Sequence, residues 1–231
     1  MPHPAEAAIR AVLFDFHCTL VDQGDGAAWL DLAWARLGRH GSAAEALGEP
    51  RASRLSDLLH HVWDGARDID PHNRRDLDPT VHRRVFSELI RRHFADLDDD
   101  LIAALYGTVT DLWTLYTDAI PTLAGLRAAG IRTALVSNIG MDIHDVLDRC
   151  GLSELFDAVV LSYEIGAVKP ERAIFERALK LIDVPAHEAL MVGDNWRDDA
   201  GAAELGCRVL ILPRTSGPEH GLGRVLALTR P

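Results

Sequence analysis

Apolar residues follow two different patterns along the chain. Near the N-terminal end, residues 9–14 (IRAVLF) form a short, mostly apolar run that stops at Asp15. A short apolar run of this kind is typical of a strand that is buried on both faces of a sheet. From about residue 25 to residue 118, apolar side chains recur at intervals of three and four. This spacing predicts helices throughout the middle third of the chain.

Beyond residue 121 the pattern alternates between short apolar runs and helical spacing. It predicts strands at 132–136, 158–161, 189–192 and 208–212, and helices at 122–129, 142–149, 172–181 and 198–205. Strands that alternate with helices are typical of βαβ units, which form parallel sheets. We therefore predict an α/β fold with a doubly wound parallel sheet and an inserted all-helical domain. The expected bounds are 1–21 and 119–231 for the α/β core and 22–118 for the insertion.

Composition and net charge indicate which class of protein this is and which partners are excluded. With 48% hydrophobic and 26% charged residues, the 231-residue chain has the values of an ordinary globular protein. The 35 acidic residues outnumber the 24 lysines and arginines, which gives a net charge of −11. This charge repels nucleic acid and anionic lipid, so we expect neither as a partner. Three dispersed cysteines without a CxxC pair, and no apolar stretch of membrane-spanning length, favour a cytoplasmic protein.

Polar residues that suit one kind of chemistry follow four of the predicted strands. Asp15 follows the first strand, Ser137 and Asn138 follow the second, Lys169 comes a few residues after the third, and Asp194 follows the fourth. Because the carboxyl ends of parallel strands meet at one edge of the sheet, we expect these side chains to converge. A carboxylate nucleophile, a hydroxyl group, a cation and a second carboxylate together indicate phosphoryl transfer.

The segments around these residues resemble a known family. DFHCTL, VSN, VKP and GDNWRDDAGA resemble, in this order, the four motifs of the haloacid dehalogenase superfamily of hydrolases. The resemblance spans most of residues 9–212 outside the helical insertion. It is strongest to the branch with a helical cap inserted after the first motif. It implies a Rossmann-like core that carries the active site and a cap domain at 22–118 that selects the substrate.

The resemblance also implies a nucleophile and a metal site. Asp15 matches the residue that forms an aspartyl-phosphate. Mg²⁺ is then expected to be held by Asp15, the backbone carbonyl of His17 and Asp194, with Asp199 acting through water. Oxygen ligands of this kind, with retained waters, are those that Mg²⁺ prefers.

Other positions are expected to bind the substrate. Ser137 matches the residue that donates a hydrogen bond to a phosphoryl oxygen, and Lys169 matches the cation that neutralises the nucleophile and the transferring group. We further expect Thr19, Asn138 and Trp29 to contact the substrate.

One position departs from the phosphatase pattern. Phosphatases of this superfamily carry a second aspartate two residues after the nucleophile, as general acid and then general base, whereas this chain has His17. Three interpretations follow. His17 itself is the acid and base, because imidazole titrates at pH ~6.5. Alternatively, the site has no proton donor and favours good leaving groups, or His17 is structural in a site that binds but barely reacts.

These observations lead to one preferred function and two alternatives. We predict a Mg²⁺-dependent phosphatase, monomeric or homodimeric, that acts on a small phosphorylated metabolite. The phosphonatase branch is excluded because residues 22–118 contain no lysine for a Schiff base. A metal-independent hydrolase similar to 2-haloacid dehalogenases stays open because of His17 and the Ser137–Asn138 pair, although the acid at Asp194 favours a metal. The third possibility is a catalytically weak binding or regulatory protein.

Overall fold

The computed structural model describes residues 7–229 of the chain. These residues form two compact units. The core unit contains the described residues up to Asp22 and from Leu115 onward, and the helical unit contains Gln23–Thr114. Each unit has its own buried apolar interior, and each is described by itself below.

A five-stranded parallel sheet forms the centre of the core unit, in the order β5-β4-β1-β6-β7. The strands are β1 (Ala11–Phe14), β4 (Arg132–Ser137), β5 (Ala158–Leu161), β6 (Ala189–Gly193) and β7 (Arg208–Ile211). The first strand lies in the middle, and the chain adds strands first on one side of it and then on the other. The sheet is therefore doubly wound, as predicted, and its topological switch point lies at the carboxyl end of β1.

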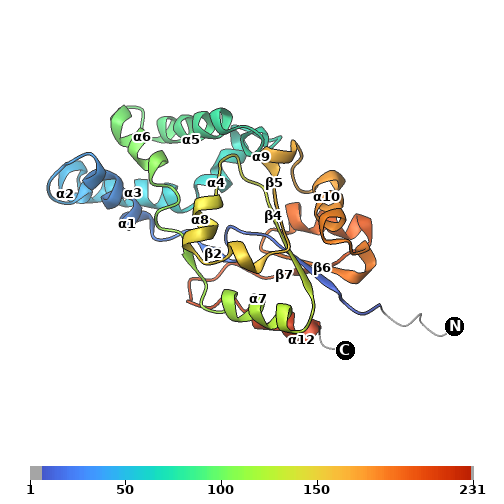
Figure 1. The fold of residues 1–231 in the computed structure, drawn as a ribbon. Coiled ribbons are helices and arrows are strands. Elements are labelled where there is room, and N and C mark those ends of the chain that lie inside the picture. Colours follow the sequence, from blue (N-terminus) through green and yellow to red (C-terminus); the bar gives the residue numbers. More distant parts are fainter. Residues whose placement is uncertain (1–6, 230–231) are drawn as a thin grey trace. The chain divides into compact units, whose positions relative to one another are not determined.

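Helices cover both faces of this sheet (Figure 1). Helix α10 (Arg172–Ile182) packs against β4 and β5, and its Phe175 belongs to the same apolar cluster as Leu13 and Met191 of the sheet. Helix α7 (Ala119–Ala128) packs against β4 on the other side, and α12 (Gly223–Leu228) packs against α7. The shorter helices are α8 (His144–Arg149), α9 (Ser162–Ile165) and α11 (Trp196–Asp199).

Part of the core unit differs from the expected elements. The helix expected at 198–205 is instead the short α11 followed by a 3₁₀ helix at Ala200–Leu205. Within this segment a Cβ atom on Gly201 would lie 2.6 Å from the carbonyl oxygen of Pro170, so only glycine allows this approach. Helix α12 and the two-residue strands β2 (Val21–Asp22) and β3 (Thr114–Leu115) are too short for apolar periodicity to reveal.

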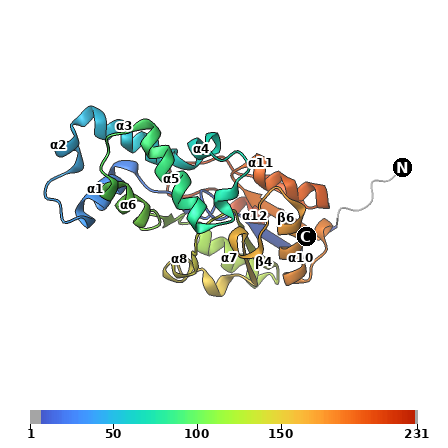
Figure 2. The same ribbon diagram turned by 90° about the horizontal axis from the view of Figure 1, so that it is seen from above.

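Helices are the regular elements of the helical unit, as predicted for the insertion, apart from Thr114 at the start of β3. Its α-helices are α1 (Gly26–Arg36), α2 (Ala43–Leu47), α3 (Glu49–His60), α4 (Val62–Gly65), α5 (Pro79–His93) and α6 (Asp99–Gly107). Helix α1 packs against α3 and α6, and α5 packs against α6 (Figure 2). The side chains of Asp25, Asp78 and Asp98 accept hydrogen bonds from the first amides of α1, α5 and α6, which fixes where these helices begin. Between residues 7 and 229, no helix is long and apolar enough to cross a membrane.

Candidate active site

The carboxyl ends of β1, β4 and β6 bring the candidate residues to one edge of the sheet. Asp15 directly follows β1, and its backbone N–H donates to the carbonyl of Val192 in β6 at 2.9 Å. Ser137 is the last residue of β4 and is buried, and Asp194 directly follows β6. Only 7% of Asp15 is exposed, so the candidate nucleophile lies in a largely desolvated position at the topological switch point.

Lys169 connects the first motif to the fourth. Its ammonium donates to Oδ1 of Asp15 at 2.6 Å and to Oδ1 of Asp199 at 2.7 Å, and the side chain is 2% exposed. Burial by itself lowers the pKa of Lys169, but the two carboxylates outweigh this effect and raise the pKa above its usual value. Burial also raises the pKa of Asp199, which the charge of Lys169 opposes. The lysine therefore remains a fixed cation between two carboxyl groups.

Asn138 and Thr19 bind protein groups within the site. The side-chain amide of Asn138 donates to the carbonyl of Lys169 at 2.9 Å and accepts from its N–H at 2.6 Å. The hydroxyl of Thr19, which is fully buried, donates to Oδ2 of Asp15 at 2.9 Å. These contacts favour positioning roles for both residues. The contact with substrate that we expect from each of them stays a prediction.

A tight turn follows the nucleophile and carries His17. The amides of Leu20 and Val21 both donate to the carbonyl of Phe16, at 2.8 and 3.2 Å. Cys18 adopts a left-handed backbone conformation with φ of 62°. The Nδ1 atom of half-buried His17 lies 3.5 Å from Sγ of Cys18. Burial raises the pKa of the Cys18 thiol above its usual range, so this thiol is protonated and unsuited to act as a nucleophile.

Three carboxylates form a cluster that fits a divalent cation. Asp15, Asp194 and Asp199 each offer an oxygen, and these oxygens lie within 4.8 Å of one another. The carboxylate of Asp199 accepts from the N–H of Asn195 at 3.0 Å, and a Cβ atom on Gly193 would lie 2.0 Å from its Oδ2. The glycine thus makes room for this carboxylate. Oxygen donors at this spacing suit Mg²⁺, so the residues present match the metal that the sequence motifs imply.

A further cation, Arg214, lies outside the four motifs. Its Nε donates to Oδ2 of Asp194 at 2.6 Å, from the segment that follows β7. Burial and the charge of Asp15 raise the pKa of Asp194 to about 6, and the guanidinium of Arg214 opposes this shift. Sequence reasoning missed this residue. The only signal was the position of Arg214 shortly after the predicted strand at 208–212, at the same edge as the other strand ends.

Trp29 lies in the interior of the helical unit. It is 6% exposed, its ring centroid is 5.9 Å from that of Phe86, and its indole N–H donates to the carbonyl of Leu105 at 3.0 Å. These contacts give Trp29 a structural role in packing α1 against α5 and α6. The contact with substrate that we expect for Trp29 stays a prediction.

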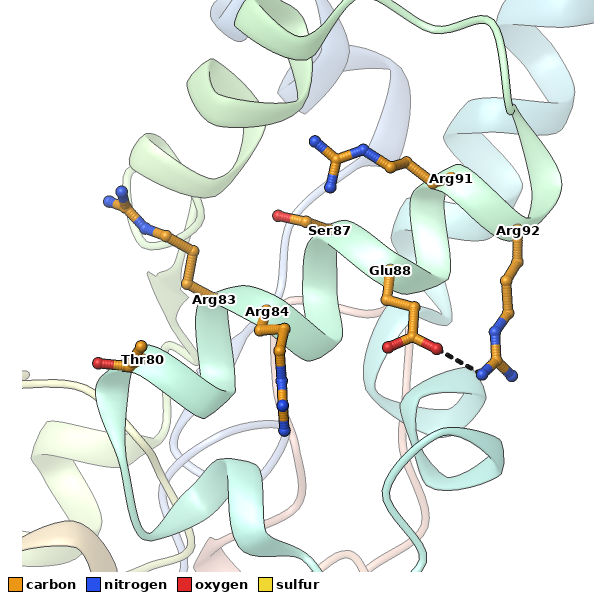
Figure 3. A pocket seen from close by; sticks show the side chains of 7 residues that line it. All are labelled: Thr80, Arg83, Arg84, Ser87, Glu88, Arg91 and Arg92. Carbon is orange, nitrogen blue, oxygen red and sulfur yellow. Dashed lines mark hydrogen bonds and ion pairs between the residues drawn. The ribbon is translucent and has the colours of Figure 1, made fainter.

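Helix α5 carries a shallow pocket lined mainly by arginines. Its lining side chains are Thr80, Arg83, Arg84, Ser87, Glu88, Arg91 and Arg92 (Figure 3). Arg92 forms an ion pair with Glu88 at 2.5 Å, and Arg91 forms one with Asp99 at 2.8 Å. Exposed pairs of this kind are typical of a solvated helix surface. This pocket therefore lacks the buried, converging groups that the strand ends of the core unit provide.

Comparison with known proteins relates the chain to a family of hydrolases. Residues 9–206 match the family of haloacid dehalogenase-like hydrolases. The chain is 37% identical over 93 residues to haloacid dehalogenase-like hydrolase domain-containing protein 3 of Xenopus laevis, covering 40% of this chain and 38% of that protein. It is 37% identical over 131 residues to glyceraldehyde 3-phosphate phosphatase of Methanopyrus kandleri, covering 54% and 56%. The L-2-haloacid dehalogenase of Xanthobacter autotrophicus has a similar structure, with a TM-score of 0.65, 22% identity and coverage of 96% and 85%.

The chain belongs to the family of haloacid dehalogenase-like hydrolases, because the family match covers most of its length. This confirms the family and the hydrolase class predicted from the four segments. The matches span 38% and 56% of the two curated relatives' own lengths. At 22% identity, the likeness to the dehalogenase structure shows the shared fold alone.

Proposed function

We propose that this hydrolase is a Mg²⁺-dependent phosphatase that acts on a small phosphorylated metabolite through an aspartyl-phosphate on Asp15. The observation that carries the proposal is the carboxylate cluster of Asp15, Asp194 and Asp199, with oxygens within 4.8 Å of one another. The buried ammonium of Lys169 lies beside it. Phosphoryl transfer depends mainly on positioning and charge neutralisation, which such a cluster serves. The similarity to a glyceraldehyde 3-phosphate phosphatase supports the same class of substrate.

The contacts of Asp15 prepare it to attack phosphorus. Lys169 holds Oδ1 and Thr19 holds Oδ2, so the carboxylate has one orientation. In the first step an Asp15 oxygen bonds to phosphorus and the bond from phosphorus to the leaving oxygen breaks. That oxygen takes the electron pair and a proton from His17. Ser137 donates a hydrogen bond to a phosphoryl oxygen.

The second step releases phosphate. A water molecule attacks the phosphorus of the aspartyl-phosphate, and His17 accepts its proton. The bond between phosphorus and Asp15 breaks, which restores the carboxylate and gives inorganic phosphate. When held by Asp15, Asp194 and the carbonyl of His17, with Asp199 acting through water, Mg²⁺ supplies positive charge that offsets the phosphoryl oxygens.

The helical unit has a role in this proposal as well. We assign residues 22–118 to a cap domain that selects the substrate. Trp29 then supports the packing of that domain, because its indole N–H is already bonded to Leu105. A cytoplasmic location and a monomeric or homodimeric state belong to the same proposal.

A specific observation favours a second candidate function, a metal-independent reaction of the dehalogenase type. Lys169 and Arg214 already supply two cations to the three carboxylates, so the charge of the site is nearly balanced without a metal. In that reaction an Asp15 oxygen displaces halide from carbon, and water then hydrolyses the resulting ester. The non-acidic His17 and the Ser137–Asn138 pair fit this alternative. A protein that binds ligand in this site but barely turns it over is the third candidate.

The deciding experiment measures hydrolysis of an aryl phosphate and an alkyl phosphate, with and without Mg²⁺. We expect the parent protein to require both Mg²⁺ and Asp15, so that Asp15→Asn is inactive. His17→Asp should accelerate the alkyl ester more than the aryl ester, because an alkoxide leaving group needs a proton more. Asp145→Asn, which changes an exposed acid on α8, is the matched control and should keep parent activity.

Other outcomes would contradict the proposal. If neither the parent nor His17→Asp shows Mg²⁺-dependent turnover, the phosphatase assignment is wrong. Release of halide from a 2-haloacid without metal would establish the second candidate. A phosphorylated Asp15 that forms and does not hydrolyse would favour the third.

A further inference from the structure

The ion pair between Arg214 and Asp194 is a feature that the proposed function does not use. We propose that Arg214 is a displaceable counter-cation of Asp194, which a divalent metal must replace, so that this arginine weakens and thereby tunes metal binding. The inference rests on the proposed function in so far as Asp194 is a metal ligand. Arg214 lies outside the four motifs, and the inference gives it the role of a cation that competes with the metal for Asp194.

The charges of the site explain why such a cation is needed. The side chains of Asp194 and Asp199 are only 5% and 0% exposed, and with Asp15 they place three carboxylates within 4.8 Å of one another. Like charges this close and this desolvated repel strongly. Lys169 binds two of the three, Asp15 and Asp199. Arg214 binds the third, so each carboxylate has a cationic partner in the absence of a metal.

The two cations differ in their freedom to leave. The side chain of Lys169 is 2% exposed and is enclosed by protein, whereas that of Arg214 is 43% exposed. A guanidinium group at the surface can turn into water at little cost, but a buried ammonium cannot. A metal ion bound at Asp194 would compete with the guanidinium for the negative charge of this carboxylate and would repel the guanidinium. Arg214 is therefore the cation that gives way.

The segment that carries Arg214 is anchored on both sides. At its start, the N–H of Leu212 donates to the carbonyl of Gly193, next to Asp194, at 2.9 Å. Further along, the carboxylate of Asp118 accepts hydrogen bonds from the amides of His220, Gly221 and Leu222, at 3.1, 2.8 and 2.7 Å.

Thr117 and Tyr116, which directly precede Asp118, also contact this segment. The N–H and the hydroxyl of Thr117 both donate to the carbonyl of Pro218, at 2.8 and 3.1 Å. The ring of His220 stacks on Tyr116 with centroids 4.8 Å apart. Because the backbone is held at several points, Arg214 stays close to Asp194. Its guanidinium can therefore form the ion pair again when no metal is bound.

Calorimetric titration of Mg²⁺ into the metal-free protein tests the inference. Arg214→Gln removes the competing cation, and we expect it to bind Mg²⁺ at least about tenfold more tightly than the parent. Without metal, the same variant should unfold at a lower temperature than the parent, because Asp194 then lacks its partner. A purely structural role for Arg214 would lower stability without tightening metal binding.

Two further variants serve as a control and as a conservative substitution. Arg132→Gln is the matched control, because Arg132 forms an ion pair of the same 2.6 Å length with Asp157. This pair lies at the opposite end of β4 from Ser137, so the variant should keep the Mg²⁺ affinity of the parent. Arg214→Lys retains a competing cation and should bind Mg²⁺ with an affinity between those of the parent and Arg214→Gln. This variant also provides the test if Arg214→Gln does not fold.

The failures of the inference and of the proposed function are distinguishable. Equal or weaker Mg²⁺ binding by Arg214→Gln and Arg214→Lys overturns the role of Arg214 and leaves the phosphatase assignment intact. Absence of Mg²⁺ binding in the parent and in both variants overturns both. Tighter binding by the Arg214 variants in a protein without phosphatase activity supports the role of Arg214 and overturns the phosphatase.

Discussion

The side-chain amide of Asn138 holds the backbone of Lys169 at both its N–H and its carbonyl, at 2.6 and 2.9 Å. The two residues are 31 positions apart: Asn138 directly follows β4, whereas Lys169 lies in the segment after α9. The ammonium of Lys169 in turn binds Asp15 and Asp199. Asn138 therefore determines where the backbone of the catalytic cation lies, and through it how the nucleophile is held.

Replacement of Asn138 by alanine should impair catalysis through this clamp. Removal of both hydrogen bonds leaves the N–H and the carbonyl of Lys169 without these partners, at a cost of about 1–3 kcal/mol in the free energy of unfolding. We expect kcat with an aryl phosphate to fall by about tenfold or more, since a small displacement of a catalytic group has effects of this size. Steady-state kinetics and urea unfolding of the same samples measure the two effects.

A second substitution separates the two halves of the clamp. Asn138→Asp keeps an oxygen that accepts from the N–H of Lys169 but loses the donor to its carbonyl. It should retain more activity than Asn138→Ala. A parent-like kcat in Asn138→Ala would contradict the positioning role.

The sequence was most informative where a polar residue directly follows a buried strand. Asp15, Ser137 and Asp194 each follow an apolar run, and a parallel sheet requires such residues to share an edge. Their place in the fold could therefore be predicted without knowledge of any loop.

The contacts that the sequence did not reveal depend on loop conformation and helix packing. The path of the chain after β5 decides that Asn138 meets Lys169, and no spacing rule encodes that path. Arg214 lies in a segment without a motif, although its position after a strand was a usable signal. The burial of Trp29 depends on how α1 meets α5 and α6, which apolar periodicity alone does not specify.

Thr19 gives a test of how the nucleophile is oriented. Its hydroxyl donates to Oδ2 of Asp15 at 2.9 Å in a fully buried position. Thr19→Val replaces the hydroxyl with a methyl group of similar size, so Asp15 keeps its surroundings but loses this donor. We expect kcat for aryl phosphate hydrolysis to fall by about tenfold, which corresponds to a loss of about 1.4 kcal/mol in transition-state stabilisation. Thr19→Ser, which keeps the hydroxyl, should retain most of the activity, and equal rates for the two variants would contradict this role.

Substitution of Gly193 tests whether the Asp199 carboxylate needs the space that the missing side chain leaves. A Cβ atom at this position would lie 2.0 Å from Oδ2 and 2.3 Å from Cγ of the Asp199 carboxylate, which is fully buried. Gly193→Ala must therefore displace that carboxylate from Lys169, and we expect a loss of about 3 kcal/mol or more in the free energy of unfolding. Thermal and urea unfolding measure this loss.

A matched glycine provides the control for Gly193→Ala. Gly223 is the first residue of α12, and a Cβ atom there would have no heavy atom within 4 Å. Gly223→Ala should be neutral or slightly stabilising, since alanine favours the helix by up to about 1 kcal/mol. Similar losses in the two variants would show that the contact with Asp199 is not the cause.

The helical unit should carry an acid-sensitive group, His82. This side chain in α5 is 3% exposed, its Nδ1 lies 2.9 Å from the hydroxyl of Tyr106, and its ring centroid is 4.3 Å from that of Trp63. Burial, and secondarily the charge of Arg75, lower the pKa of His82 to about 3. An unfolded histidine titrates at pH ~6.5. Between these values the unfolded state binds more protons than the folded state, so stability is complete above pH 6.5 and is lost as the pH falls toward 3.

His82→Gln removes this proton linkage and keeps a side chain that can hydrogen-bond to Tyr106. From pH 7 to pH 4.5, about two units below the unfolded pKa, the parent should lose about 2–3 kcal/mol more of its free energy of unfolding than the variant does. Urea unfolding at the two pH values measures the difference. His93→Gln, which changes an exposed histidine of the same helix, should follow the parent. An equal loss of the free energy of unfolding in the parent and in His82→Gln would contradict this prediction. The acid sensitivity would then arise from other groups.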